Sequence, residues 1–307
     1  MAQGEIQVGP VRVLGVSDAT VDYPWPLEEL FPGVSVGAWT DYRARFPDVF
    51  ANATTYRSDY ICYLLRAPGR NILVDTGMGP SSAPLAALFG QGGQLLDKLA
   101  AVGVRPEDVD TVVLGHLHPD HVGWNVLPNE EGYHLTFPRA RYVVNQADWD
   151  AFHTPEVQAH FPFPFVDQLV TPLQQLGALE LIVADHLLSP EIRLWHTPGH
   201  TPGHLSTLIS VGNERALIWG DVAIHPAQVT EPDLNAMFDM DAAVARATRA
   251  AVLDRVEAEG MTVAARHFPE PGFGRVVRLE GRRYWQVITV PERVQPPAPN
   301  NTVDDPM

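Results

Sequence analysis

The chain has 307 residues and a single cysteine, Cys62, in the segment DYICYLLRA. One thiol cannot form a disulfide within the chain, and a zinc site built from several cysteines is excluded as well. The apolar residues on both sides of Cys62 predict a buried thiol in a strand rather than a reactive one.

Basic residues are scarce too: the chain has 21 Lys and Arg against 37 Asp and Glu, a formal net charge of −16 at pH 7. An acidic surface repels phosphate backbones and anionic lipid headgroups, so we expect neither nucleic acid nor a membrane as a partner. No stretch reaches the ~18 apolar residues of a membrane span, and the first residues lack the pattern of a signal peptide. We therefore expect a cytoplasmic protein.

Apolar residues make up 45% of the chain, which is enough for a large core. A helix with clear ends is predicted over 239–260, with Asp239 or Asp241 as its N-cap and Gly260 at its end. Strands come first, then strands alternate with helices, and strands close the chain. This order predicts an α/β sandwich of two mixed β-sheets flanked by helices. The predicted strands and hairpins cover 5–16, 60–77, 110–116, 140–148, 179–185, 191–200, 205–221, 261–268 and 274–290.

We expect one domain over residues 1–290. Within it, residues 19–58 are rich in proline and aromatics, which predicts an irregular N-terminal arm that covers the site or forms a dimer contact. Residues 291–307 are polar and proline-rich, which is typical of a loosely held tail.

The densest cluster of ionisable residues lies in GHLHPDHVGW, residues 115–124. Positions i and i+2 of an extended chain project to the same side, so His116 and His118 can direct two imidazoles at one point. Pro119 then turns the chain, and Asp120 and His121 face a neighbouring point. One segment can thus serve two adjacent metal positions, and its nitrogen and oxygen donors suit zinc, iron or manganese.

Further histidines and aspartates stand where other predicted strands end. Ionisable groups that recur at separate strand ends indicate one shared site where those ends converge. These residues are His196, His200 and His204 in WHTPGHTPGH, Asp221 in LIWGD, His267 in AARHF, and Asp75 in ILVDTG.

Together these segments resemble the five sequence motifs of the metallo-β-lactamase superfamily, in their usual order across residues 70–270. The resemblance implies the αββα fold, with the site between the two sheets. It also implies the ligand set: the first metal is bound by His116, His118 and His200, the second by Asp120, His121 and His267, and both by a bridging Asp221. By the same resemblance Asp75 orients a ligand histidine. We expect His196 and His204 to pack nearby.

The implied cofactor is a pair of divalent metal ions, with zinc expected first and iron or manganese as alternatives. Two such ions can share a water and turn it into hydroxide near neutral pH. The chain is therefore predicted to be a hydrolase of an apolar ester, lactone or phosphotriester, with Asp120 and Asp221 as its catalytic residues. A mononuclear iron oxidoreductase of the persulfide dioxygenase type and a thioester hydrolase similar to glyoxalase II stay open as alternatives.

Within the superfamily, two hydrolase subgroups are most similar. The N-acyl-homoserine lactonases share the HTPGHTPGH-like segment, but they usually carry a tyrosine three residues after the bridging aspartate, where this chain has Ile224. The methyl parathion hydrolase-like subgroup has an apolar residue there and resembles most of residues 60–288.

The substrate is expected to be a small molecule with an apolar group, because aromatic residues follow the metal motif in the chain. Core packing or a homodimer contact is the alternative explanation for each of them. The residues predicted to line the pocket are Trp149, Phe152, Phe161, Phe163, Ile224 and His225.

Overall fold

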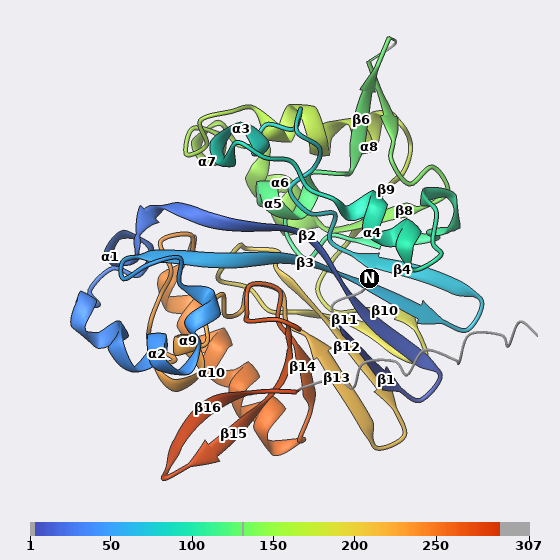
Figure 1. Ribbon diagram of the computed structural model, residues 1–307. Helices are drawn as coiled ribbons and strands as arrows, with labels where there is room; N and C mark the ends of the chain where they lie inside the picture. Colours follow the sequence, from blue (N-terminus) through green and yellow to red (C-terminus); the bar gives the residue numbers. More distant parts are fainter. Residues whose placement is uncertain (1–3, 131, 289–307) are drawn as a thin grey trace, which may run out of the picture.

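The computed structural model describes residues 4–130 and 132–288 (Figure 1). Over these residues the chain forms two seven-stranded sheets and a two-stranded ribbon. Sheet 1 has the order β1-β2-β3-β4-β5-β8-β9, and sheet 2 runs β10 to β16 in chain order. Both are mixed, because β4, β5, β8 and β9 are parallel in sheet 1 and β13 and β14 in sheet 2.

Sheet 1 contains β1 (Gly4–Val8), β2 (Val11–Pro26), β3 (Thr55–Ala67), β4 (Arg70–Val74), β5 (Thr111–Val113), β8 (Arg141–Asn145) and β9 (Leu179–Ile182). Sheet 2 contains β10 (His186–Ser189), β11 (Ile192–His196), β12 (Leu205–Val211), β13 (Glu214–Ile218), β14 (Thr262–Ala264), β15 (Phe273–Leu279) and β16 (Arg282–Val287). The ribbon is β6 (Val126–Asn129) with β7 (Gly132–Leu135).

The helices are mostly short. They are α1 (Leu27–Leu30), α2 (Thr40–Arg45), α3 (Ala86–Phe89), α4 (Leu95–Ala101), α5 (Pro119–Val122), α6 (Gln146–Phe152), α7 (Pro155–Gln158), α8 (Thr171–Gln175), α9 (Ala227–Thr230) and α10 (Ala242–Ala258). The 3₁₀ turns are η1 (Val36–Trp39), η2 (Pro47–Val49) and η3 (Pro106–Asp108), and η4 (Val166–Val170) is a π-helix.

The two sheets pack face to face, with helices on both outer sides, so the predicted αββα sandwich is confirmed (Figure 1). β3 shows how the sequence produces these layers. Ile61, Tyr63 and Leu65 point into the core between the sheets, whereas Cys62 and Leu64 point toward the helix layer that includes α4 and α6. A strand buried on both faces is a continuous apolar run, as YICYLL is. The thiol of Cys62 is buried, as predicted.

The long helix α10 covers the outer face of sheet 2, where Val252, Leu253 and Val256 pack beneath Leu217 and Val263. Its N-cap is Asp241, whose carboxylate accepts hydrogen bonds from the amides of residues 243 and 244, both at 3.0 Å. The alternative cap predicted from the sequence, Asp239, has a different role, described below. The predicted hairpins are also present, β12–β13 turning at Gly212 and β15–β16 at Gly281.

The prediction of an irregular segment over 19–58 was wrong at both ends. β2 continues to Pro26 and β3 begins at Thr55, although prolines interrupt the sequence at 24 and 26. β1 pairs with β2 only as far as Gly15, so beyond that residue β2 is an edge strand, where proline is tolerated. The predicted strand over 5–16 likewise divides into β1 and β2, at a turn with Gly9 at φ +53°.

The arm is therefore the stretch 27–54, made of short helices and 3₁₀ turns. Its residues Leu30, Phe31 and Trp39 are fully buried in a cluster that also contains Ile224 and Ala227. The arm thus packs against the segment that follows β13. None of the helices in the described part of the chain is long and apolar enough to span a membrane. The predicted tail, 291–307, lies outside the described residues.

Candidate metal centre

The HLHPDH segment begins three residues after the end of β5 and ends in α5. His118 is the N-cap of α5 with an extended backbone, and Pro119 occupies the first helical position. This local structure brings Asp120 and His121 to the same centre from the start of α5, with the ring centroids of His116 and His121 3.9 Å apart. Asp75, which follows β4, fixes the start of the segment, because its Oδ1 accepts the amide hydrogen of Gly115 at 2.8 Å.

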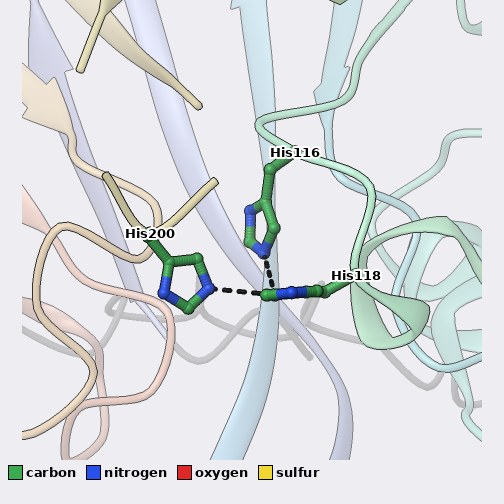
Figure 2. A group of neighbouring side chains, drawn as sticks. All are labelled: His116, His118 and His200. Atoms are coloured by element: carbon green, nitrogen blue, oxygen red, sulfur yellow. Dashed lines mark hydrogen bonds between the residues drawn. The ribbon is translucent and has the colours of Figure 1, made fainter. Parts of the chain in front are cut away.

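The first group of ligand candidates contains His116, His118 and His200 (Figure 2). The Nε2 atom of His116 and the Nε2 atom of His200 each lie 2.9 Å from Nδ1 of His118. The first two residues come from the loop after β5 and His200 from the loop after β11, so the group joins the two sheets. Three imidazole nitrogens that converge in this way form a nitrogen donor set for a metal ion.

The second group contains Asp120, His121 and His267. Oδ2 of Asp120 lies 3.4 Å from Nε2 of His121 and 3.6 Å from Nε2 of His267. His267 follows β14 of sheet 2, so this group also draws on both sheets.

Asp221, three residues beyond β13, lies between the two groups. Its Oδ2 is 3.4 Å from Nε2 of His200 in the first group and 3.3 Å from Nε2 of His267 in the second. Its Oδ1 is 3.5 Å from Nε2 of His121. The carboxylate therefore occupies the position from which it can bridge two ions.

The side chains of this centre fit divalent cations. Nε2 of His121 and Oδ1 of Asp221 are buried and have no hydrogen-bond partner among the described residues. Such atoms are costly to bury unless a ligand satisfies them. Burial lowers the pKa of His118 to about 3, so its imidazole is neutral and able to bind metal. Burial would raise the pKa of Asp120, but His121 and Arg266 outweigh it and keep the carboxylate ionised.

Three ligand candidates have a neighbouring polar side chain close to their other ring nitrogen. Nδ1 of His121 lies 2.9 Å from Oδ2 of Asp75, an ion-pair contact. Asp75 takes a left-handed backbone conformation there, with φ +64°, which is uncommon outside glycine and typical of functional sites. Contacts of this kind fix the orientation of a ligand ring.

The other two such neighbours were missed in the sequence. Oγ of Ser58 lies 2.8 Å from Nδ1 of His267, and Oδ1 of Asp239 lies 3.0 Å from Nδ1 of His200. Ser58 was assigned to the irregular segment and Asp239 to a helix cap. No local pattern marks either residue, because each meets its histidine through tertiary packing.

Arg266, beside His267 in the chain, is 1% exposed and was also missed. Its guanidinium donates to the carbonyl oxygens of Asp120 and Ile61 and lies over the ring of Tyr60, 5.3 Å from the centroid. It therefore fixes the backbone of the α5 segment from the sheet 2 side.

The WHTPGHTPGH loop is supported from α6. The buried carboxylate of Asp148 accepts hydrogen bonds from the hydroxyl of Thr201 at 2.8 Å and from the amide of Gly203. His204 packs beside the ligands, as expected, with its ring centroid 5.3 Å from that of His116, whereas Nε2 of His196 lies 2.9 Å from the carbonyl oxygen of Pro202. The loop is thereby held so that His200 faces the metal groups.

Two of the predicted pocket residues lie beside the first group. The rings of Phe152 and Phe161 have centroids 5.6 and 5.9 Å from that of His118. Trp149 lies against His153 within the core under sheet 1. Phe163 is half-buried against the arm cluster that contains Tyr23 and Ile224.

The remaining two pocket predictions, Ile224 and His225, lie under the arm. The carbonyl oxygen of Ile224 accepts a hydrogen bond from the hydroxyl of Tyr56. The ring of His225 is fully buried, and its Nδ1 accepts the amide hydrogen of Ala227 at 3.0 Å. Aromatic rings surround it, at centroid distances of 5.1 to 6.3 Å: Phe31, Trp39, Tyr42, Phe50 and Tyr56.

The sandwich, with clustered histidines and aspartates at the ends of strands from both sheets, defines a protein of the metallo-β-lactamase type. The sequence profile of the Metallo-beta-lactamase superfamily matches residues 61–267, and the chain belongs to that superfamily. The resemblance stated from the motifs is thus confirmed.

Among curated proteins, the chain is similar to N-acyl homoserine lactonases. It is 34% identical over 161 residues to one from Bacillus sp, covering 48% of this chain and 57% of that protein. It is 30% identical over 125 residues to the lactonase AttM of Rhizobium radiobacter, covering 40% of this chain and 44% of that protein. The matched segments thus span about half the length of these relatives.

Two solved structures share the fold over nearly the whole chain. One is AbOPH, a hydrolase in the beta lactamase superfamily, with TM-score 0.80 and 24% identity, covering 94% of this chain and 98% of that chain. The other is AidC, a dizinc quorum-quenching lactonase in complex with the product N-hexanoyl-L-homoserine, with TM-score 0.76, 23% identity and the same coverage.

Proposed function

We propose that this protein is a hydrolase that holds two divalent metal ions and cleaves an ester bond in a small molecule with an apolar group, with an acyl lactone as the first candidate. The observation that carries the proposal is the position of Asp221, whose carboxylate lies within 3.5 Å of His121, His200 and His267. A carboxylate shared by two donor groups supports a dinuclear centre over a mononuclear one. The first ion takes His116, His118 and His200, and the second takes Asp120, His121 and His267.

When bound, a metal pair lowers the pKa of water and stabilises negative charge on a substrate oxygen. The chain contributes the surroundings of that reaction. The Asp120 side chain is 15% exposed against 6% for Asp221, so Asp120 is the more accessible carboxylate of the centre. Asp120 can accept a proton at Oδ2 and deliver it to a leaving group. Arg266, 3.7 Å away, favours its ionised form between those steps.

The side chains beside the centre and the relatives support the proposed substrate class. Phe152 and Phe161 flank His118 and offer apolar contact to an acyl or aryl group. The curated relatives are named N-acyl homoserine lactonases. An N-acyl homoserine lactone contains both the ester bond and the apolar chain that this arrangement suits.

The test combines metal analysis with a substrate panel on one preparation. We expect two zinc ions per chain and hydrolysis of N-acyl homoserine lactones in preference to aryl esters, phosphotriesters and thioesters. A preference for a phosphotriester or a thioester would keep the dinuclear centre but overturn the lactone assignment. A single iron with oxygen-dependent activity on a persulfide would overturn the hydrolase proposal.

The homodimer expected from the aromatic arm stays a prediction. Sedimentation velocity of the metal-loaded protein is its direct test, with a mass of one chain as the contrary result.

A further inference from the structure

Asp239 and Arg249 form a buried ion pair directly behind His200. Nη2 of Arg249 lies 3.1 Å from Oδ2 of Asp239, and both side chains are nearly inaccessible, at 1% and 2% exposed. The other carboxylate oxygen, Oδ1, lies 3.0 Å from Nδ1 of His200. Because each carboxylate oxygen is used by a different partner, Asp239 links the guanidinium to the imidazole.

Arg249 holds more than Asp239. Its Nε donates to the carbonyl oxygen of Val222 at 2.8 Å, and its Nη1 donates to those of Pro232 at 2.8 Å and Leu234 at 2.7 Å. One residue of α10 therefore fixes both the chain just after Asp221 and the segment that leads to Asp239.

That segment, residues 232–240, also contacts the arm and the His200 loop. The amide of Met237 donates to the carbonyl oxygen of Leu30 at 2.8 Å, and the amide of Met240 donates to that of His200 at 3.0 Å. Phe238 packs against Tyr23 and Trp25 of β2. The backbone at 237–240 thus lies between the arm and a metal ligand.

We propose that Asp239 and Arg249 are positioning residues that orient His200 for the first metal ion and tie this ligand to the segment 232–240 and, through it, to the arm. The inference rests on the proposed dinuclear centre. It assigns to this pair a role that the metal motifs do not contain.

The chemistry of the histidine ring explains the first part. With Asp239 accepting the hydrogen of Nδ1, the neutral ring keeps the lone pair on Nε2, and that nitrogen faces His118 and Asp221. Without the carboxylate the ring is free to take the other tautomer or to rotate, and either change withdraws a donor from the first site. Arg249 keeps the carboxylate in place and neutralises its buried charge.

The test uses the full chain loaded with zinc and titrated with a competing chelator. Asp239→Asn preserves the shape of the side chain, and Arg249→Met removes the guanidinium while keeping an unbranched apolar stem. We expect each variant to lower the zinc affinity of one of the two metal sites by roughly 10–100-fold and to leave the affinity of the other site unchanged. Arg255→Met is the control, since Arg255 lies on the same helix in a partly exposed pair with Glu259, at 2.9 Å.

Hydrogen exchange provides a second measurement that does not depend on activity. Zinc should slow exchange of the amides of Met237 and Met240 in the unmodified protein and in Arg255→Met, and this effect should be lost in Asp239→Asn. An equal loss of zinc affinity at both sites, or no change at either site, would overturn the positioning role even in a folded, active enzyme. If the unmodified chain binds fewer than two metal ions, the proposed dinuclear centre fails first and the inference falls with it.

Discussion

Nε2 of His204 accepts the backbone amide hydrogen of Asp221 at 2.9 Å. Its other nitrogen, Nδ1, lies 2.8 Å from Oγ1 of Thr197. The last histidine of HTPGHTPGH therefore holds the backbone of the bridging carboxylate. Gly220 makes this approach possible, because a Cβ there would come within 2.6 Å of the His204 nitrogen.

Gly220→Ala tests that relationship. Gly220 has φ +59°, so alanine is strained there, and its methyl group would displace His204 and with it Asp221. Gly212→Ala is the matched control, with φ +56° and open space around it. Both variants should lose about 1–3 kcal/mol of stability in denaturant unfolding. Only Gly220→Ala should also have a lower zinc content and a lower kcat. An equal loss of zinc in Gly220→Ala and Gly212→Ala would argue against a role for the His204 contact.

Asp120→Asn should lower kcat by about 10²–10⁴-fold, because the amide cannot accept and return a proton. The thermal midpoint should change little, since the side chain is small and isosteric. Zinc content and kcat are measured on the same sample, with Asp254→Asn as an exposed control on α10. Near-normal turnover in Asp120→Asn with both ions bound would remove Asp120 from the proton path.

Asp148 should make stability depend on pH. Burial raises the pKa of its carboxyl to about 6, above the unfolded value of 3.8, so the folded protein binds the proton more tightly. The free energy of unfolding contributed by this group is therefore highest below about pH 4, falls as the pH rises to 6, and stays low above it.

Asp148→Asn keeps a group that can accept the Gly203 amide and pair with Thr201, but it cannot ionise. It should be more stable than the unmodified protein at pH 7 by up to roughly 3 kcal/mol, from the pKa difference, and the gap should narrow below pH 5. Urea unfolding of metal-free protein at several pH values measures this gap. Asp167→Asn, at an exposed position on η4, is the control, and a gap that does not vary with pH would contradict the assignment.

His225→Phe separates packing from substrate contact. The phenyl ring can fit among Phe31, Trp39 and Tyr56, but the amide of Ala227 loses its acceptor, which costs about 1–3 kcal/mol of unfolding free energy. We expect a lower thermal midpoint with unchanged KM. An increase in KM with an unchanged midpoint would instead support the pocket role predicted from the sequence.

Phe161→Ala should reduce kcat/KM for long-chain acyl lactones by about tenfold, since an apolar contact beside His118 is removed. The loss should shrink as the acyl chain is shortened. Leu176→Ala, at a position that is 41% exposed, serves as the control. The same loss for every chain length would place Phe161 outside the acyl contact.

The sequence predicted the layers and the ligand candidates because both depend on local patterns. Apolar runs such as YICYLL mark strands buried on both faces, and HLHPDH concentrates four donors in one turn. The continuation of β2 past Val16 was missed because proline disfavours a strand interior, and the sequence does not show that this part of β2 is an edge.

Ser58, Asp239 and Arg249 were missed for another reason. Each acts on a residue distant in the chain: Ser58 meets His267 across 209 positions, and Asp239 meets His200 across 39. A hydroxyl, a carboxylate or a guanidinium is common everywhere in a sequence, so only the fold shows which of them reach a ligand.

The ligand-bearing segments come from both halves of the sandwich. Asp75 and the HLHPDH segment extend from sheet 1, whereas His200, Asp221 and His267 extend from sheet 2. Two ions bound among them would fasten one half of the protein to the other, in a chain whose lone thiol rules out an internal covalent cross-link. Metal binding would then add to the apolar core in holding the two sheets together, so chelation is expected to lower the free energy of unfolding of the whole sandwich.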